Sequence, residues 1–97
     1  MSEAFTAIAT VIAKPGQGTA LERQLRNLVA PSRAEAGCQF YDLHQDLEHA
    51  DAFYVLERWD NEAALQTHNA TAHFQAFQVA AAELIEHFKL KRLRVLG

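Results

Sequence analysis

The chain has 97 residues, of which 49% are hydrophobic and 22% charged, and its formal net charge is -3. A chain of this length holds one core, so we expect a single domain over residues 1–97. The acidic balance disfavours nucleic acid and anionic membranes as partners, because proteins that bind them are usually basic. The one cysteine, Cys38, rules out an intrachain disulfide and a cysteine-based metal site.

No basic leader followed by an apolar run is visible in the sequence. No uninterrupted apolar stretch approaches the ~20 residues that a membrane-spanning helix needs. We therefore expect a soluble protein of a reducing compartment, the cytoplasm.

The first predicted element is a strand over residues 5–13, which is rich in β-branched residues and apolar on both faces. Residues 14–18 follow it with strong turn chemistry, Lys-Pro-Gly-Gln-Gly. Thr19 is a suitable N-cap for a helix that runs to about Val29.

The end of that helix is marked by proline and glycine. Pro31 is expected to interrupt the helix, although residues 32–36 could add a further turn. Gly37 is the expected C-cap of this segment.

Two strands are predicted next, over residues 38–45 and 52–59. The polar link over residues 46–51 is short, so the two strands form an antiparallel hairpin.

A second helical region follows, with Asp60 as its expected N-cap. The helix is expected to break near residues 70–71, where Thr71 caps a second segment that continues through Phe88. The last predicted strand, over residues 89–96, alternates basic and aliphatic residues.

The element order βαββαβ predicts an α+β fold, the ferredoxin-like plait. Two helices can cover only one face of its four-stranded sheet. The strands over 5–13 and 52–59 are apolar at both parities, and a large exposed apolar face is rare on a monomer. We therefore expect a homodimer whose sheets pack face to face.

Trp59 leads from the third strand into the second helical region and is the first candidate for a functional site. It either packs in the core, with Asp60 only capping the helix, or walls a pocket and stacks on a flat substrate. Phe74, Phe40 and Phe77 are the other aromatic candidates for the walls of such a pocket.

His68 and His73 are candidate catalytic residues on either side of the expected helix break. Their spacing of five differs from the i, i+4 spacing of a helical metal pair. The expected helix break removes that objection but creates no ligand set, so no metal site is predicted. A neutral histidine can accept a proton, and His73 at a helix start is a suitable general base. The alternative for both residues is a capping or hydrogen-bonded role.

His44 and Glu57 are the remaining catalytic candidates, one on each strand of the hairpin. Whether they share a sheet face with Trp59 depends on the register, since a one-residue slip reverses the answer. A carboxylate on an apolar strand face costs free energy unless it is paired. The alternative role for Glu57 is therefore a salt bridge, for example to Arg92 or Arg94.

The basic side chains of the last strand, Lys89, Lys91, Arg92 and Arg94, have two possible roles. Charges on an edge strand protect against aggregation, or they hold an anionic or phosphorylated ligand.

Several stretches together resemble the antibiotic biosynthesis monooxygenase domain family. They are Pro31–Cys38, Phe40–Asp46, Phe53–Trp59, Ala64–Leu65, His68 and Thr71–Phe74, so the resemblance covers nearly the whole chain. The family's usual Thr-Pro-His is Thr71-Ala72-His73 here, without the proline that starts the helix. The resemblance implies a dimeric α+β barrel.

The chemistry that the resemblance implies varies within the family. Some members oxidise phenols or quinols with O₂ and no cofactor, others degrade haem, and one branch isomerises a phosphorylated sugar. The haem-degrading branch uses an Asn, a Trp and a His where this chain has Ile8, His68 and Gln78, which disfavours haem degradation.

The leading hypothesis is therefore a homodimeric monooxygenase that oxidises a quinol-like or phenolic small molecule with O₂ and no cofactor. A deprotonated quinol reduces O₂ directly, so the protein needs only a base, an aromatic wall and a dry pocket. His73 or His44 is the expected base, with Glu57 or His68 orienting the substrate. The alternatives are an isomerase or aldolase-like enzyme for a phosphorylated metabolite, and a non-enzymatic dimeric ligand-binding module.

Overall fold

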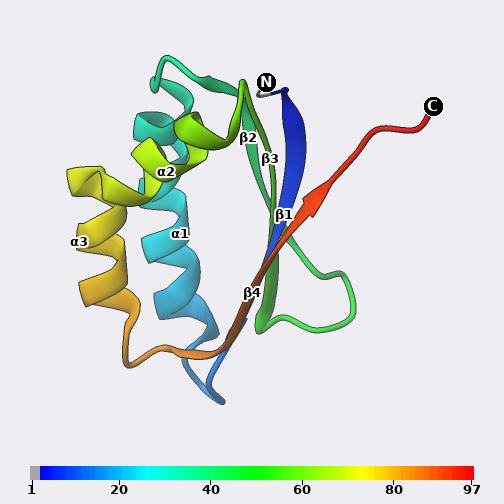
Figure 1. Cartoon of the computed structure of the whole chain (residues 1–97). Coiled ribbons are helices and arrows are strands. Elements are labelled where there is room, and N and C mark those ends of the chain that lie inside the picture. Colours follow the sequence, from blue (N-terminus) through cyan, green and yellow to red (C-terminus); the bar gives the residue numbers. More distant parts are fainter. Residues whose placement is uncertain (1–2) are drawn as a thin grey trace.

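The computed structural model describes residues 3–97, so residues 1–2 of the expected domain lie outside the described part. The strands are β1 (Phe5–Ala13), β2 (Cys38–Gln45), β3 (Ala52–Trp59) and β4 (Ile85–Leu93), and the helices are α1 (Gly18–Arg33), α2 (Glu62–Ala70) and α3 (Ala72–Ala81). The strands form one antiparallel sheet in the order β2-β3-β1-β4, and the three helices cover one of its faces (Figure 1). The predicted ferredoxin-like plait is confirmed.

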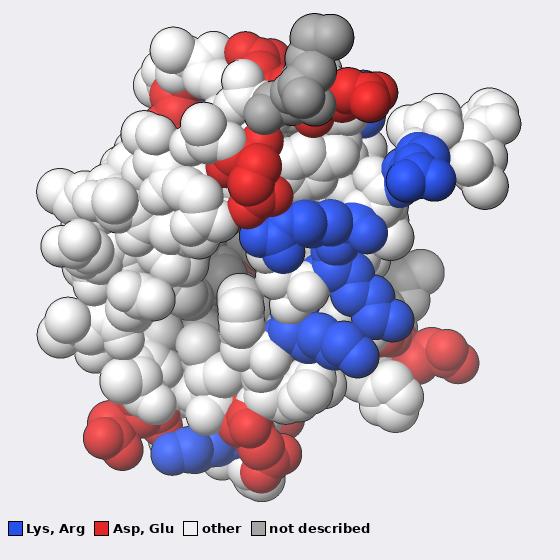
Figure 2. Space-filling model, in the orientation of Figure 1, with Lys and Arg blue, Asp and Glu red and all other residues white. Residues whose placement is uncertain are grey.

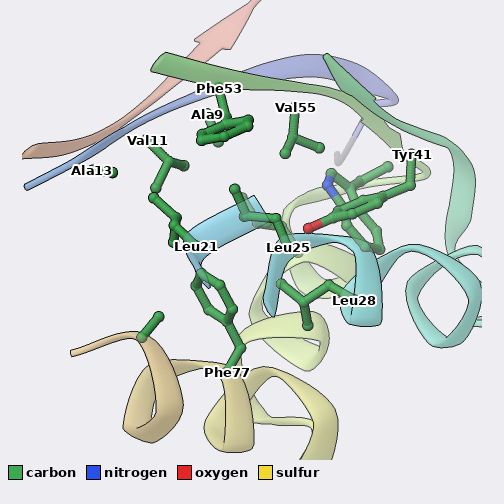
Figure 3. Close-up of a cluster of buried hydrophobic side chains, with 13 residues drawn as sticks. Ala9, Val11, Ala13, Leu21, Leu25, Leu28, Tyr41, Phe53, Val55 and Phe77 are labelled. Carbon is green, nitrogen blue, oxygen red and sulfur yellow. The ribbon is translucent and has the colours of Figure 1, made fainter. Parts of the chain in front are cut away.

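The core lies between the helices and the helix-covered face of the sheet (Figure 3). Alternate residues of each strand point to the same face, and on β1 and β3 these alternate positions are buried. They pack against the apolar stripe of α1, formed by Leu21, Leu25 and Leu28, and against Phe77 of α3. The predicted strands 5–13, 38–45 and 52–59 are confirmed residue for residue.

Helix α1 differs from the prediction at both ends. It begins at Gly18, its N-cap is Gln17 and not the predicted Thr19, and it continues through Pro31 to Arg33. Tertiary contacts hold the turn after the proline, because the Arg33 guanidinium donates to the backbone oxygen of Tyr41 and pairs with Asp42.

The predicted caps at Gly37 and Asp60 are also wrong. The C-cap of α1 is Ala34, and Gly16 is the one glycine with positive φ among residues 3–97. Gly37 is needed for space instead, because a Cβ there would clash with the Cβ of Ala64 on α2. The N-cap of α2 is Asn61, whose side chain accepts a hydrogen bond from the backbone N–H of Ala64.

The C-terminal third shows the largest departure from the prediction. The helix expected to reach Phe88 ends at Ala81, and β4 begins at Ile85 instead of residue 89. The helical periodicity through Phe88 is overridden by pairing with β1, whose free edge forms a ladder from Ala13↔Ile85 to Thr6↔Leu93. Tertiary pairing therefore converts the end of a predicted helix into strand.

The basic residues of β4 lie on an edge strand, as the charged-edge interpretation requires. Lys and Arg side chains gather in a band along this part of the surface (Figure 2). Arg92 is paired with Glu62 on α2 through two hydrogen bonds of 2.8 Å each. Among residues 3–97, no helix is long and apolar enough to cross a membrane.

Candidate active site

A cavity of about 250 Å³ lies between the sheet and the helices. Most of its lining is apolar and comes from β1, β3, β4 and all three helices. The polar groups in the lining are Tyr41, Glu57, His68, Asn69 and Gln78. Phe74 and Phe77, two of the predicted aromatic walls, line it as well. The cavity is thus a small apolar chamber with a few polar groups, the usual character of a small-molecule site.

Glu57 and Trp59 are placed on the cavity side of the sheet by the register of β3. The pairs Ala7↔Glu57 and Phe5↔Trp59 put both on the helix-covered face. The indole Nε1–H of Trp59 donates to Oε1 of Glu57 at 2.8 Å. Trp59 is fully buried and does not line the cavity, so it is not the predicted pocket wall. Its role is to hold the carboxyl of Glu57 by this hydrogen bond.

Glu57 is a buried carboxyl with unusual acidity. Its side chain is only 3% exposed, and burial raises its pKa from 4.5 to about 7. The hydrogen bond from Trp59 opposes this rise, and the nearby Glu35 adds to it. Glu57 therefore changes protonation state near neutral pH. The salt bridge to Arg92 or Arg94 considered from the sequence is not formed within residues 3–97, and Arg92 pairs with Glu62 instead.

His68 and His73 meet at a carboxylate that the sequence analysis did not single out, Glu35. The Nδ1 of His68 and the Nε2 of His73 each lie 2.7 Å from the same oxygen, Oε2 of Glu35. A carboxylate oxygen can only accept, so each imidazole donates its N–H to it. The other oxygen of Glu35, Oε1, is buried with no hydrogen-bond partner among residues 3–97.

Thr71 creates the corner between α2 and α3 that lets the two histidines converge. Its hydroxyl donates to the backbone oxygen of His68 at 2.7 Å and accepts from the backbone N–H of Phe74 at 3.2 Å. Thr71 therefore closes α2 and caps α3, as the sequence predicts. Without this break, residues five apart on one helix would point in different directions.

His68 is enclosed by aromatic rings. Its centroid lies 4.7 Å from that of Trp59, 5.0 Å from that of Phe74 and 5.6 Å from that of Tyr41. Burial lowers the pKa of His68, while the hydrogen bond to Glu35 opposes that fall. Because Nδ1 is bonded to Glu35, the free ring nitrogen of this cavity-lining residue is Nε2. A neutral His68, which lines the cavity, thus has a proton-accepting nitrogen that is not bonded to Glu35.

Tyr41 is a second residue that sequence analysis missed. It is 3% exposed, lines the cavity and lies opposite Glu57 in the β2–β3 pairing. Burial, with the Glu57 carboxyl nearby, raises the pKa of its phenol, which stays protonated as a donor. The sequence could not show that Tyr41 lies on the same sheet face as Glu57, because that depends on the register of β2 against β3.

His44 and Phe40 do not belong to this site. The pairs Phe40↔Arg58 and His44↔Tyr54 place both on the opposite face of the sheet from Glu57. The convergence of His44 with Glu57 and Trp59, one of the two registers considered, is therefore wrong. His73 lies behind Glu35 and does not line the cavity.

Glu35 lies in Pro31–Cys38, one of the stretches that carry the family resemblance, but nothing in the sequence marks it as a site residue. It lies in the connection between α1 and β2, where its backbone bonds to Ser32 and Cys38 fold the chain into a tight turn. A carboxylate in a short alanine-rich segment has no periodicity to mark it as buried. Only the packing of this turn against α2 places it beside His68.

The comparisons with known proteins agree with this architecture. The family model for antibiotic biosynthesis monooxygenases matches residues 4–80. The chain belongs to the antibiotic biosynthesis monooxygenase family. It is 39% identical over 77 residues to the putative monooxygenase YcnE of Bacillus subtilis (strain 168), covering 79% of this chain and 81% of the relative.

Solved structures of other proteins are closely similar to this chain over nearly its whole length. The crystal structure of PA3566 from Pseudomonas aeruginosa has a TM-score of 0.94 and 49% identity, covering 100% of this chain and 98% of that one. The structure of Rv0793 from Mycobacterium tuberculosis has a TM-score of 0.89 and 26% identity, covering 98% and 97%. The family match and the names of the relatives support a monooxygenase-like function.

Proposed function

We propose that this protein is a cofactor-independent monooxygenase that oxidises a small quinol-like or phenolic substrate with O₂. One observation carries the proposal: a buried histidine, held through Nδ1 by a carboxylate, lies in the wall of a small apolar cavity. The same pairing of carboxylate and imidazole fixes the tautomer of catalytic histidines in other enzymes. It makes His68 the general base.

The proposed reaction starts with transfer of a phenolic proton to Nε2 of His68. The resulting anion is electron-rich and reduces O₂ directly, so the substrate supplies the electrons. One oxygen atom enters the substrate and the other leaves as water. The overall reaction converts a quinol and O₂ into a hydroxylated quinone and water. Phe74 and Phe77 hold the ring, and the apolar lining keeps water from the reacting anion.

Glu35, His73 and Glu57 act around this base. Glu35 positions His68, and His73 holds the same carboxylate oxygen from the other side. Glu57, with its pKa of about 7, can take up or return a second proton within the cavity. In this scheme the base is His68, whereas the sequence favoured His73 or His44.

The cavity gives less support to a phosphorylated substrate. No Lys or Arg is among its lining residues in the described part of the chain. The basic residues of β4 lie outside it, and Arg92 is already paired with Glu62. An isomerase or aldolase-like role for a phosphorylated metabolite is therefore the weaker candidate.

A homodimer is part of the proposal. The face of the sheet away from the helices carries Ile8, Ile12 and Leu56, which are half-buried although no helix covers them. An apolar sheet face of this kind is rare on a monomer, and a second copy offers the same surface. Sedimentation equilibrium at micromolar protein tests the dimer, and a mass of one chain would contradict it.

Oxygen uptake tests the catalytic proposal. Metal-stripped protein is mixed with hydroquinone or with a naphthohydroquinone, and uptake is compared for wild type, His68→Ala and His44→Ala. We expect His68→Ala to lose about 10²–10⁴-fold in rate and His44→Ala to retain it, since His44 lies on the other sheet face. Uptake abolished by His44→Ala and not by His68→Ala would overturn the assignment.

A further inference from the structure

The cluster of Glu35, His68 and His73 has a second chemical capacity besides holding a base. One carboxylate and two imidazoles each offer a ligand atom, and all these atoms lie within 4.8 Å of one another. The cluster is largely shielded from solvent, with side-chain exposures of 12% for Glu35, 3% for His68 and 25% for His73. Two histidines and a carboxylate form a ligand set typical of zinc and related divalent metals.

We propose that Glu35, His68 and His73 form a binding site for a divalent transition-metal ion such as Zn²⁺. The site combines two nitrogen ligands from the α2–α3 corner with one oxygen ligand from the α1–β2 connection. The sequence alone predicted no metal site, because two histidines five apart lack a third ligand nearby in the chain.

The two distances from Oε2 of Glu35 need only a small expansion to accept an ion, and the two ring nitrogens lie within 4.8 Å of each other. Ligands about 2.0–2.1 Å from a tetrahedral zinc are separated by roughly 3.3 Å, against the 2.7 Å between Glu35 Oε2 and each ring nitrogen. His73 is the most exposed of the three and lies at the start of α3, so it has room to move. Oε1 of Glu35, buried and without a partner among residues 3–97, offers a further ligand oxygen.

The carboxylate end of the cluster borders a surface depression that is separate from the substrate cavity. Glu35 lines a separate open depression together with Gly37, Ala64, Thr67 and Thr71. None of these four residues lines the substrate cavity, which His68 does line. A water from this depression could fill the open coordination position, as in zinc sites with three protein ligands.

Metal binding has a definite consequence for the proposed function, on which this step rests. A metal bound to Nδ1 of His68 leaves the ring proton on Nε2, the nitrogen that the proposed mechanism uses as base. In that tautomer His68 can donate a hydrogen bond but cannot take a proton from a substrate. The ion therefore inhibits proton abstraction while it stabilises the fold.

The binding test uses Co²⁺ and Zn²⁺ alone and needs no turnover. Metal-stripped protein is titrated with Co²⁺ by visible absorption and with Zn²⁺ by calorimetry. The variants are His73→Ala, His73→Gln and Glu35→Gln, with His87→Ala as the control because His87 is an exposed histidine on β4. Circular dichroism identifies any variant that fails to fold. If one of the two His73 variants is unfolded, the binding comparison uses the other.

We expect one ion per chain and at least ten-fold weaker binding in the Glu35 and His73 variants, with His87→Ala unchanged. Equal affinity in wild type and a folded His73 variant, or no saturable binding to wild type, would overturn the site.

Zn²⁺ is then added to the oxygen-uptake assay. Inhibition that follows occupancy supports the coupling of the metal to His68, and full occupancy with unchanged uptake overturns that coupling alone. A metal-stripped enzyme that never consumes O₂ contradicts the proposed function and leaves the binding result standing.

Discussion

The two faces of the sheet are built from the same strands, yet they have different surroundings. The face under the helices buries Phe53 and Val55 and also carries Glu57, which is 3% exposed and bonded to Trp59. The opposite face carries Phe40 and His44, with no helix above them (Figure 1). On the helix-covered face, Glu57 acquires a raised pKa and lines a confined cavity, whereas His44 on the other face does not line that cavity. Function follows from what covers a strand, more than from the residues of the strand alone.

The largest expected effect contrasts one phenylalanine from each face. Phe53→Ala removes a ring that is 1% exposed and leaves a core cavity, so we expect it to lower the free energy of unfolding by about 3–5 kcal/mol. Phe40→Ala, at a residue 37% exposed on the outer face, should cost about 1 kcal/mol or less. Urea unfolding measures both, and similar losses would mean that the two faces are equally packed.

The next effect concerns the buried carboxyl of Glu57. Its pKa rises from 4.5 to about 7 on folding, so the folded state favours the protonated form. The contribution of Glu57 to the free energy of unfolding should be fully present below pH 4.5. It should be lost, by about 3 kcal/mol, as the pH rises through 7. Glu57→Gln should remove that part of the pH dependence. Parallel profiles for wild type and Glu57→Gln, from denaturant unfolding between pH 4 and 8, would assign the pH dependence to other groups.

The smallest effect on the fold of one chain is expected on the outer face. Leu56→Arg places a charge among the half-buried apolar residues there, so it should dissociate the proposed dimer while the chain keeps its secondary structure. Leu47→Arg is the matched control, because Leu47 is fully exposed in the polar link. Sedimentation velocity separates the two, and a Leu56→Arg protein of unchanged mass would place any dimer contact elsewhere.

The local elements could be predicted because their signals are local. Residues 5–13, 38–45 and 52–59 have the β-branched and aromatic composition of strands, and the structure has strands with those bounds. Thr71 was predicted to recap the helix because its hydroxyl needs only residues three positions away. The end of α3 was mispredicted, since the residues from Ile85 to Phe88 fit a helical stripe until β1 pairs with them.

The sequence by itself determined three strands, the hairpin and the helix break. It also identified the histidines and Glu57 as candidate site residues. It could not determine which of them meet, because the strand register and the α1–β2 turn depend on contacts between distant segments. The register of β2 against β3 places His44 on one face of the sheet and Glu57 on the other. The turn brought Glu35 to His68 and His73, residues 33 and 38 positions further along the chain. Tertiary structure made the site, since a buried carboxylate is stable only where its hydrogen-bond partners converge.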